Sequence, residues 1–193
     1  MHDSSIFASY GAVAGRRIRV SSSWAPDTAE SGTLTATTFI DARQYIPITR
    51  RSNFAFRAFG LTSEGDFPDV TFIGGLDTLR GFRVREFGGF RAFYANAEFR
   101  FPLIDVLATP ILQFQSVRGV VFFDVGAAWF PDISDFDFYN SDEDRLEDGV
   151  AAYGFGFTIR FLGLDLNWDF AKLYDFQDSA DGFETSFWIG RRF

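Results

Sequence analysis

The sequence contains no cysteine and a single histidine, and these absences exclude several classes of function. Without cysteine the chain forms no disulfide and offers no thiolate to a metal. His2 is the one histidine among 193 residues and lies beside the N-terminus. Hydrolases with a Ser-His-Asp triad and zinc sites built from several histidines therefore lack their central residue. We expect a protein that is not an enzyme and that holds neither a cofactor nor a metal.

Long hydrophobic runs and excess positive charge are also missing. A charge-free stretch such as 150–159 is only ten residues long, whereas a membrane-spanning helix needs roughly 20 apolar residues. This excludes a helical membrane protein but not a membrane β-barrel, whose strands need only about 9–11 residues each. The net charge of −8 argues against nucleic acid as a partner, because nucleic acids bind to basic surfaces.

The sequence is rich in aromatic residues, with 27 phenylalanines, and apolar residues alternate with polar ones through most of its length. Period-2 alternation predicts β-strands. Eight strands are predicted, at residues 16–26, 34–47, 52–62, 90–103, 118–130, 151–161, 163–174 and 183–193. In a soluble sandwich the apolar face of each strand points inward, whereas in a membrane barrel it meets lipid. The alternation alone leaves both architectures open.

Two features favour the membrane barrel. The connections alternate between short and long, as periplasmic turns and outer loops do. The short ones are 47–51 and 162–163, and the long ones are 64–89, 131–150 and 175–182. Aromatic residues also stand at strand ends, as an interfacial girdle requires; they are Trp24, Tyr45, Trp129, Tyr174 and Phe193. This orientation places the C-terminus in the periplasm and 64–89 outside the cell, and 104–117 is the one connection too long for it.

Three short motifs carry a resemblance to a known family. The first, within Ile73–Phe82, ends in Arg80-Gly81-Phe82; the second is Phe122-x-Asp124-x-Gly126; the third is the terminal segment Phe187–Phe193. In their order and spacing they resemble the BamA-type superfamily of bacterial surface-antigen barrels, which includes TamA-like and two-partner-secretion proteins. The resemblance covers roughly residues 15–193. It implies an all-β, antiparallel transmembrane β-barrel in which these eight strands match the last eight of sixteen.

The resemblance also implies a function and a location. It implies a bacterial outer-membrane protein that inserts or translocates outer-membrane polypeptides, with lipid and unfolded outer-membrane proteins as partners. The family's periplasmic client-binding modules and first eight strands have no counterpart here, so a structural or pore-forming barrel is the alternative. No secretory signal precedes the strands. We therefore interpret 1–14 as an N-terminal remnant or lead-in, and the chain as a piece of a longer protein with Met1 added at the cut.

The first two motifs predict a latch that holds the loop 64–89 inside the barrel. Strand register places Asp124 and Glu98 on the lumen faces of adjacent strands. The family's lumen-returning loop corresponds to the segment with Arg80, whose planar guanidinium suits paired carboxylates. The loop glycines Gly74, Gly75 and Gly81 allow sharp turns, and Phe82 is expected to pack as an apolar plug beside the ion pair.

The terminal strand predicts a recognition signal. Phe187, Ile189 and Phe193 are expected to face outward, next to Gly190, and Arg191 to lie near the headgroups. Such a strand is an edge that an assembly machine can bind by strand addition. The alternative is an ordinary final strand that ends on an aromatic residue.

Two groups of acidic residues have simpler interpretations. Segment 131–149 holds eight acids and one base and is interpreted as a solvated outer loop; calcium binding is the weaker alternative, because the EF-hand spacing is missing. Its candidate ligands are Asp135, Asp137, Asp142 and Asp144. Asp165 and Asp169 are interpreted as solvated wall residues of the lumen.

Eight strands pose a geometric problem, because a closed eight-stranded barrel is filled by its own side chains and has no room for a returning loop. Three outcomes follow: a half-barrel completed by a second copy or by N-terminal strands, a small barrel with its loop expelled, or a piece of a larger barrel. Open edges in lipid are prohibitive. We therefore expect a homodimer whose two copies complete one barrel.

Overall fold

A computed structural model gives the fold of the chain. It describes residues 1–193 except 9–10, 27–31, 77, 105–106, 109–112, 115, 132, 134–135, 142–144 and 177–178. The side chains of 107–108, 113–114, 116 and 145–146 are also left undescribed. Within the described part every regular element is a β-strand, and it contains no helix long and apolar enough to cross a membrane.

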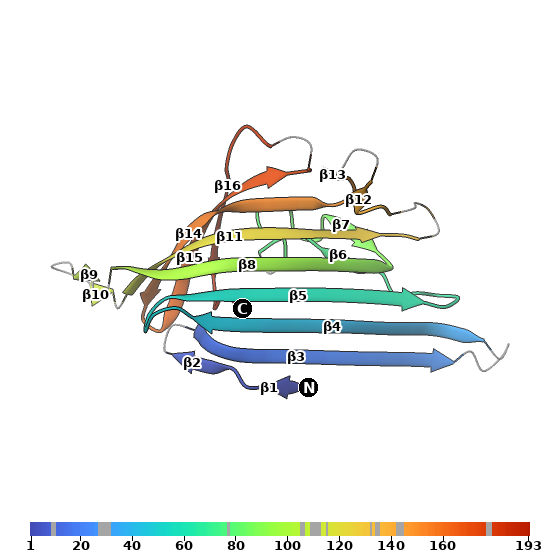
Figure 1. The fold of residues 1–193 in the computed structure, drawn as a ribbon, viewed down its shortest axis with the longest axis horizontal. Coiled ribbons are helices and arrows are strands. Elements are labelled where there is room, and N and C mark those ends of the chain that lie inside the picture. The colour runs from blue at the N-terminus through green and yellow to red at the C-terminus, as the bar shows by residue number, and fades with distance from the viewer. Residues whose placement is uncertain are drawn as a thin grey trace.

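One ten-stranded antiparallel sheet forms the body of the molecule (Figure 1). Its eight long strands are β3 (Gly11–Pro26), β4 (Thr33–Pro47), β5 (Asn53–Glu64), β8 (Arg91–Ile104), β11 (Ser116–Trp129), β14 (Val150–Phe161), β15 (Leu164–Tyr174) and β16 (Glu184–Ile189). They lie side by side in chain order. Two short strands, β1 (His2–Asp3) and β2 (Ile6–Ala8), pair with the outer edge of β3.

Each of the eight predicted strands corresponds to one of the eight long strands, although the last ends earlier than predicted. The agreement arises because alternation in the sequence follows the two faces of each strand. The connections agree as well. Leu162 and Gly163 form the tight turn between β14 and β15, and both have positive φ angles, 50° and 82°. Positive φ at both central residues is typical of the two-residue hairpin turns that match strand twist.

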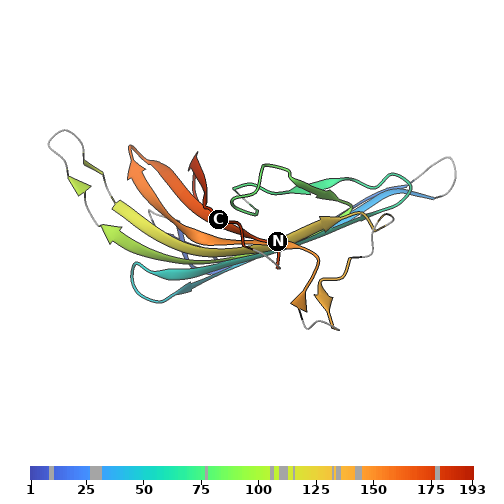
Figure 2. The ribbon, with the colours of Figure 1, turned by 90° about the horizontal axis from the view of Figure 1, so that it is seen from above.

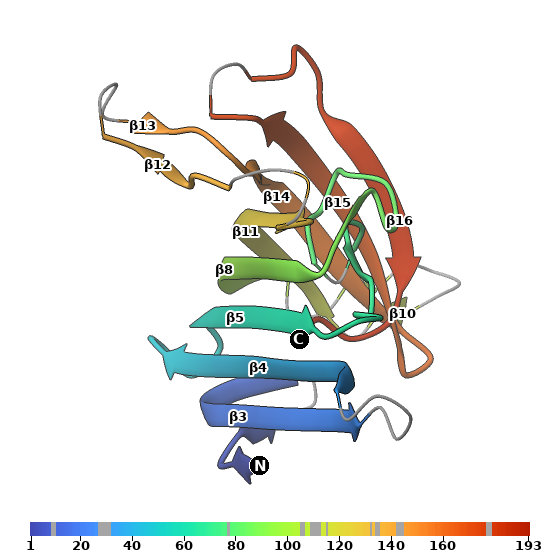
Figure 3. The same cartoon turned by 90° about the vertical axis from the view of Figure 1, so that its right-hand side faces the viewer.

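The sheet is curved (Figures 2 and 3), and its two faces differ in chemistry. On β11 the neighbours Val121 and Phe123 are 51% and 44% exposed, whereas Phe122 and Asp124 between them are 3% and 0% exposed. The same alternation runs through β8, where the buried positions are Ala92, Tyr94, Asn96, Glu98 and Arg100. The convex face is therefore apolar and exposed, and the concave face carries the buried polar residues.

The long connection 64–89 folds back over the concave face (Figure 3). It contains the small hairpin of β6 (Thr71–Ile73) and β7 (Phe87–Gly89). Ile73 and Leu79 from this connection form a buried cluster with Ala92 and Tyr94 of β8. Phe82 packs on the edge of the same cluster and meets Phe87 edge-on, with 5.2 Å between ring centroids.

Two further hairpins lie at the ends of the sheet (Figure 1). The connection 104–117, too long for a simple turn, holds β9 (Leu107–Ala108) and β10 (Gln113–Phe114). The acidic connection 131–149 holds β12 (Tyr139–Asn140) and β13 (Arg145–Leu146).

The sheet does not close on itself. Its path runs from β1 and β3 at one end to β16 at the other, and the described residues show no pairing between these ends. The small closed barrel with an expelled loop is therefore wrong for this chain: the loop lies on the concave face and the wall stays open. Residues 1–14, interpreted as a lead-in, contribute β1, β2 and the first residues of β3 to the sheet.

The predicted extent of the last strand and the outward orientation of Phe193 are wrong. β16 ends at Ile189, and Gly190 (φ 152°) begins a segment that leaves the sheet. Gly190 donates its N–H to the Asp165 carbonyl and its own carbonyl accepts from Asn167, which directs the chain onto the concave side. Phe193 packs there against a buried cluster that includes Tyr45. Tyr45 is 3% exposed, so it does not belong to an aromatic girdle.

Candidate functional site: a buried ion-pair network on the concave face

The backbone of the connection 64–89 delivers Arg80 to the concave face through a compact turn. Gly74, Gly75 and Gly81 have φ angles of 117°, 97° and 86°, which favour glycine strongly. Gly75 and Leu79 form an isolated bridge, and the Thr78 hydroxyl accepts the N–H of Gly74. The turn therefore depends on the glycines that were predicted to shape it, and it directs the side chain of Arg80 toward the sheet.

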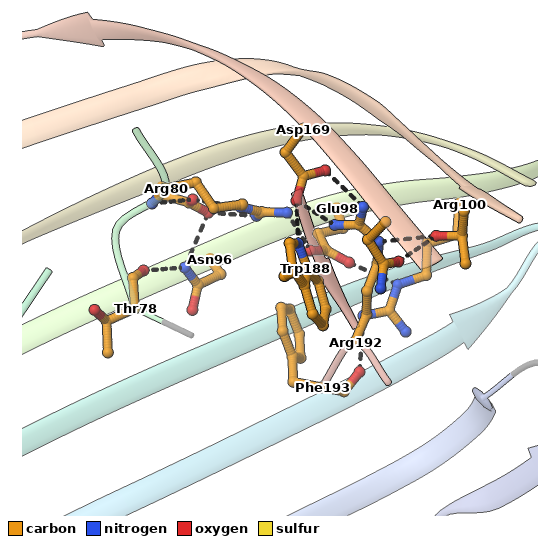
Figure 4. A network of polar contacts seen from close by, with 12 residues as sticks. Thr78, Arg80, Asn96, Glu98, Arg100, Asp169, Trp188, Arg192 and Phe193 are labelled. Carbon is orange, nitrogen blue, oxygen red and sulfur yellow. Dashed lines mark hydrogen bonds and ion pairs between the residues drawn. The ribbon is translucent and has the colours of Figure 1, made fainter. Parts of the chain in front are cut away.

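Arg80 contacts both carboxylates that the strand register brings together, Asp124 and Glu98; Figure 4 labels Arg80 and Glu98. Its Nε donates to Asp124 Oδ2 at 2.7 Å and its Nη2 donates to Asp124 Oδ1 at 2.6 Å, a bidentate pair. Its Nη1 donates to Glu98 Oε1 at 2.5 Å. The backbone N–H of residue 80 also donates to Asp124 Oδ2, at 3.2 Å. The predicted contacts of Arg80 are thus present, and the Asp124 carboxylate accepts hydrogen bonds from both the backbone and the side chain of Arg80.

The aromatic ring beside this pair belongs to Phe122 and not to Phe82. The guanidinium carbon of Arg80 lies 3.7 Å from the centroid of the Phe122 ring. Guanidinium groups stack well on aromatic faces. Phe82 instead packs against Phe87, so the prediction that it forms a plug beside the ion pair is wrong. Because side chains alternate along a strand, Phe122 lies on the same face as Asp124. This alternation is the feature of the sequence from which the contact of Phe122 with Arg80 could have been predicted.

The network continues from Glu98 to the C-terminal segment. The second oxygen of Glu98, Oε2, accepts from Arg100 Nε at 2.6 Å. Arg100 Nη2 donates to the backbone oxygen of Phe193 at 2.7 Å, and its guanidinium lies 4.9 Å from the Phe193 ring centroid. Asn96 donates to both the Thr78 carbonyl and Asp124, at 2.6 and 2.9 Å. The loop, β8 and the C-terminal segment are thereby joined.

A second centre, Asp169, holds the same C-terminal segment. Arg192 donates through Nη2 to Oδ1 of Asp169 at 2.5 Å and through Nη1 to Oδ2 at 3.2 Å. Trp188 Nε1 also donates to Oδ2, at 2.8 Å. Asp169 is fully buried. The interpretation of Asp165 and Asp169 as solvated wall residues is therefore wrong, because Asp165 is likewise buried and forms a bidentate pair with Arg160 at 2.6 and 2.7 Å.

Six charged groups at the centre of the concave face balance one another. Three guanidinium groups (Arg80, Arg100, Arg192) meet three carboxylates (Glu98, Asp124, Asp169), and each carboxylate contacts at least one of the guanidinium groups. Burial opposes the charge of Arg80, but the carboxylates of Asp124 and Glu98 prevail and raise its pKa above the ordinary value. Such a network contributes little net stability while complete, yet removal of one member leaves an uncompensated buried charge.

We use the term concave network for the six charged groups together with Asn96, Phe122 and Trp188. Arg80, Glu98 and Asp124 were predicted as site residues and come together. Asn96 and Arg100 share the face of Glu98 through the period-2 alternation of β8, so the sequence pattern gives their face but not their partners. Arg192, Asp169 and Trp188 were missed as site residues. The contact of Arg192 depends on the inward turn at Gly190, which the alternation of 183–193 does not reveal, whereas Trp188 reaches Asp169 across the paired strands β15 and β16.

The residues proposed as a C-terminal signal divide into two groups. Phe187 and Ile189 lie on the exposed convex face, 53% and 58% exposed, as expected. Gly190 and Phe193 belong to the segment that turns inward. Of the predicted signal, only the part up to Ile189 is therefore a strand with outward-facing side chains.

Metal binding finds no support in the part of the chain that the structure describes, where no cluster of three potential ligands occurs. Of the candidate calcium ligands, Asp135, Asp142 and Asp144 lie outside the described residues. The backbone N–H of Asp137, the fourth candidate, donates to the Asp148 carboxylate at 2.8 Å.

Comparison with protein families agrees with this geometry. Residues 2–193 match the family model described as the Omp85 superfamily domain. The chain belongs to the Omp85 superfamily. This is the BamA/TamA barrel family to which the motifs point, a family of non-enzymatic transmembrane β-barrels that reside in outer membranes. A search of curated proteins finds no match. The convex face of this Omp85 domain is accordingly the face toward lipid.

Proposed function

We propose that this Omp85 domain forms part of the wall of a bacterial outer-membrane barrel that inserts or translocates outer-membrane polypeptides. The observation that carries the proposal is the outer edge of β16. This strand has only six residues, it pairs on one side with Leu166–Ala171 of β15, and its other side has no partner among the described residues. A free strand edge is a template on which another strand can form main-chain hydrogen bonds.

The inward turn at Gly190 supports the same role. Because residues 190–193 are held on the concave face by Arg100 and Asp169, they do not extend β16 along the edge. The exposed edge therefore remains short. A short edge pairs with few residues of an incoming strand, so pairing is reversible, as a transient client contact requires.

The concave network has a structural role in this proposal. It fixes the connection 64–89 and the C-terminal segment on one surface, so that the lumen side of the wall is filled. The cavities beside it have volumes of about 30 and 20 Å³, and a single water molecule occupies roughly 10–15 Å³ of such volume. The packing of the connection 64–89 against the concave face favours a second candidate, a structural barrel, over a wide passive pore.

A second copy of the chain is proposed to complete the wall. Lipid offers no hydrogen bonds to the unpaired groups of β3 and β16, so both edges need protein partners in the membrane. The second copy pairs with the β16 edge while no client strand occupies it, and a client strand replaces that pairing. The mass of the detergent-solubilised protein, measured by light scattering with correction for detergent, tests this. We expect a dimer; a strict monomer at all concentrations contradicts closure by a second copy and leaves additional strands as the means of closure.

Insertion activity is tested by reconstitution in liposomes with an urea-unfolded outer-membrane barrel as client. We expect the client to fold faster than in protein-free liposomes. A peptide with the sequence of residues 184–193 competes for the edge and is expected to reduce this acceleration, whereas a scrambled peptide of the same composition does not. If the client folds at the protein-free rate, insertion activity is refuted, and the structural barrel is the better account.

A further inference from the structure

The convex face carries a groove at mid-height that the proposed function does not use. Its lining includes Phe56 and Phe123 and four alanines, Ala42, Ala58, Ala95 and Ala97, which form its floor because their side chains are the shortest. Its volume is about 560 Å³. We call it the alanine groove.

Strand register produces the groove. Ala42 of β4 pairs with Ala58 of β5, and Ala58 pairs with Ala95 of β8. Three neighbouring strands thus place an alanine at the same height. Around it the same face bears large exposed side chains, among them Ile40, Phe54 and Val121. The depression is therefore a gap in the apolar side-chain layer that meets the membrane.

One end of the groove is lined by a cation. Arg16 of β3 pairs with Gln44 of β4, and both residues are exposed on the convex face. Within the described chain no hydrogen bond or ion pair to the guanidinium of Arg16 is found; its backbone N–H donates to the Ser4 hydroxyl. A lipid-facing arginine is costly at the membrane centre and tolerated near the headgroups.

The position of Arg16 along β3 determines which leaflet of the membrane supplies the headgroups near its side chain. Gln44, opposite Arg16, is three residues from Pro47, where β4 ends at the short turn to β5. Three residues of strand span roughly 10 Å. A long arginine side chain extends toward the polar boundary from such a depth. The guanidinium therefore lies at the leaflet on the side of the short turns, and the apolar groove runs from it toward mid-membrane.

We propose that the alanine groove binds one phospholipid, with an acyl chain over the four alanines and the phosphate on Arg16. The groove supplies the apolar surface that an acyl chain fills. The guanidinium supplies the planar donor pair that suits a phosphate. Cation and groove together select an anionic lipid of that leaflet over bulk detergent.

The experiment titrates the full chain in detergent with dioleoyl phosphatidylglycerol and counts bound lipids by native mass spectrometry. We expect saturable binding of one lipid per chain. Arg16→Gln removes the charge and is expected to weaken binding roughly tenfold, the effect of one charge-assisted hydrogen bond. The matched control is Arg91→Gln on the same face at the opposite end of the wall, where binding stays unchanged.

A second pair of variants tests the groove itself. Ala58→Leu fills the centre of the floor and is expected to weaken binding at least as much as Arg16→Gln. Ala36→Leu, on the same face of β4 but outside the groove, leaves it unchanged. Circular dichroism verifies that each variant is folded; if Ala58→Leu does not fold, the smaller change Ala42→Val replaces it.

Three results overturn the proposal. In the first, the wild-type chain does not bind phosphatidylglycerol saturably. In the second, the charge and groove variants bind it as the wild type does. In the third, Ala58→Leu changes the number of protein chains per particle and leaves lipid binding intact, and the groove is then an interface for a second copy.

Discussion

The two faces of the same sheet have opposite chemistry. On the concave face, Asp124, Glu98 and Arg80 are buried and ion-paired. On the convex face, Val121 and Phe123 of the same strand as Asp124 are exposed. A water-soluble sheet hides its apolar face; this sheet hides its polar one. The difference follows from the surroundings, since lipid accepts apolar side chains, whereas the polar side must satisfy its charges internally. Loss of a single contact on the concave face should therefore destabilise the protein strongly, whereas loss of a single contact on the convex face should have little effect.

Loss of Arg80 is expected to have the largest effect. Arg80→Met leaves Asp124 without its guanidinium partner and Glu98 with Arg100 alone. Breaking a buried ion pair in this way costs about 3–5 kcal/mol. Urea unfolding in detergent, followed by tryptophan fluorescence, measures the loss. A cost below about 1 kcal/mol, the range of exposed pairs, would show that the network contributes no more than surface charges do.

Loss of the Asp169 charge is expected to have the next largest effect. Asp169→Asn keeps the shape and weakens the bonds from Arg192 and Trp188, which costs about 1.5–3 kcal/mol for a charged hydrogen-bond partner. Hydrogen exchange of residues 190–193 is expected to accelerate. The control is Asp66→Asn at an exposed position. Equal exchange in both variants would mean that Asp169 does not hold the C-terminal segment.

These two centres differ in how far the sequence predicts them. Arg80, Glu98 and Asp124 follow from strand register and from motifs that resemble the family, because a strand of period 2 fixes the face of every residue once one is placed. Asp169 and Arg192 do not, since their contact depends on a backbone turn at Gly190. The eight strands were predictable for the same reason as the first centre. The open sheet was not decided, because pairing between its first and last strands leaves no local signal in the sequence.

A backbone substitution at Gly81 is expected to cost about 1–3 kcal/mol. At its φ of 86° an alanine is strained, and its Cβ would lie 2.6 Å from Leu173 Cδ2 and 2.8 Å from Ala171 Cβ. Gly81→Ala should therefore loosen the loop beside Arg80, measured by the urea midpoint and by protease cleavage within 64–89. Gly182→Ala is the matched control, because a Cβ there meets nothing within 4 Å. The same midpoint for both variants would contradict the close approach of the loop to β15.

The smallest effect is expected on the convex side. Arg91 pairs with Glu64 at 3.1 Å, and both side chains are substantially exposed. Exposed pairs contribute about 0–1 kcal/mol, so Arg91→Gln should change the urea midpoint least of the four variants. A loss comparable to that of Arg80→Met would remove the contrast between the two faces.

The most direct test of the account is hydrogen exchange at the backbone amide of Arg80 in the wild-type protein. This N–H donates to the buried carboxylate of Asp124 across 44 positions of sequence, and it lies in a turn of the connection 64–89, outside the strands. If the connection is held on the concave face, the amide exchanges as slowly as amides in the middle of β8 and β11. If it exchanges as fast as amides of an exposed loop, the concave network does not hold the connection, and the account is wrong.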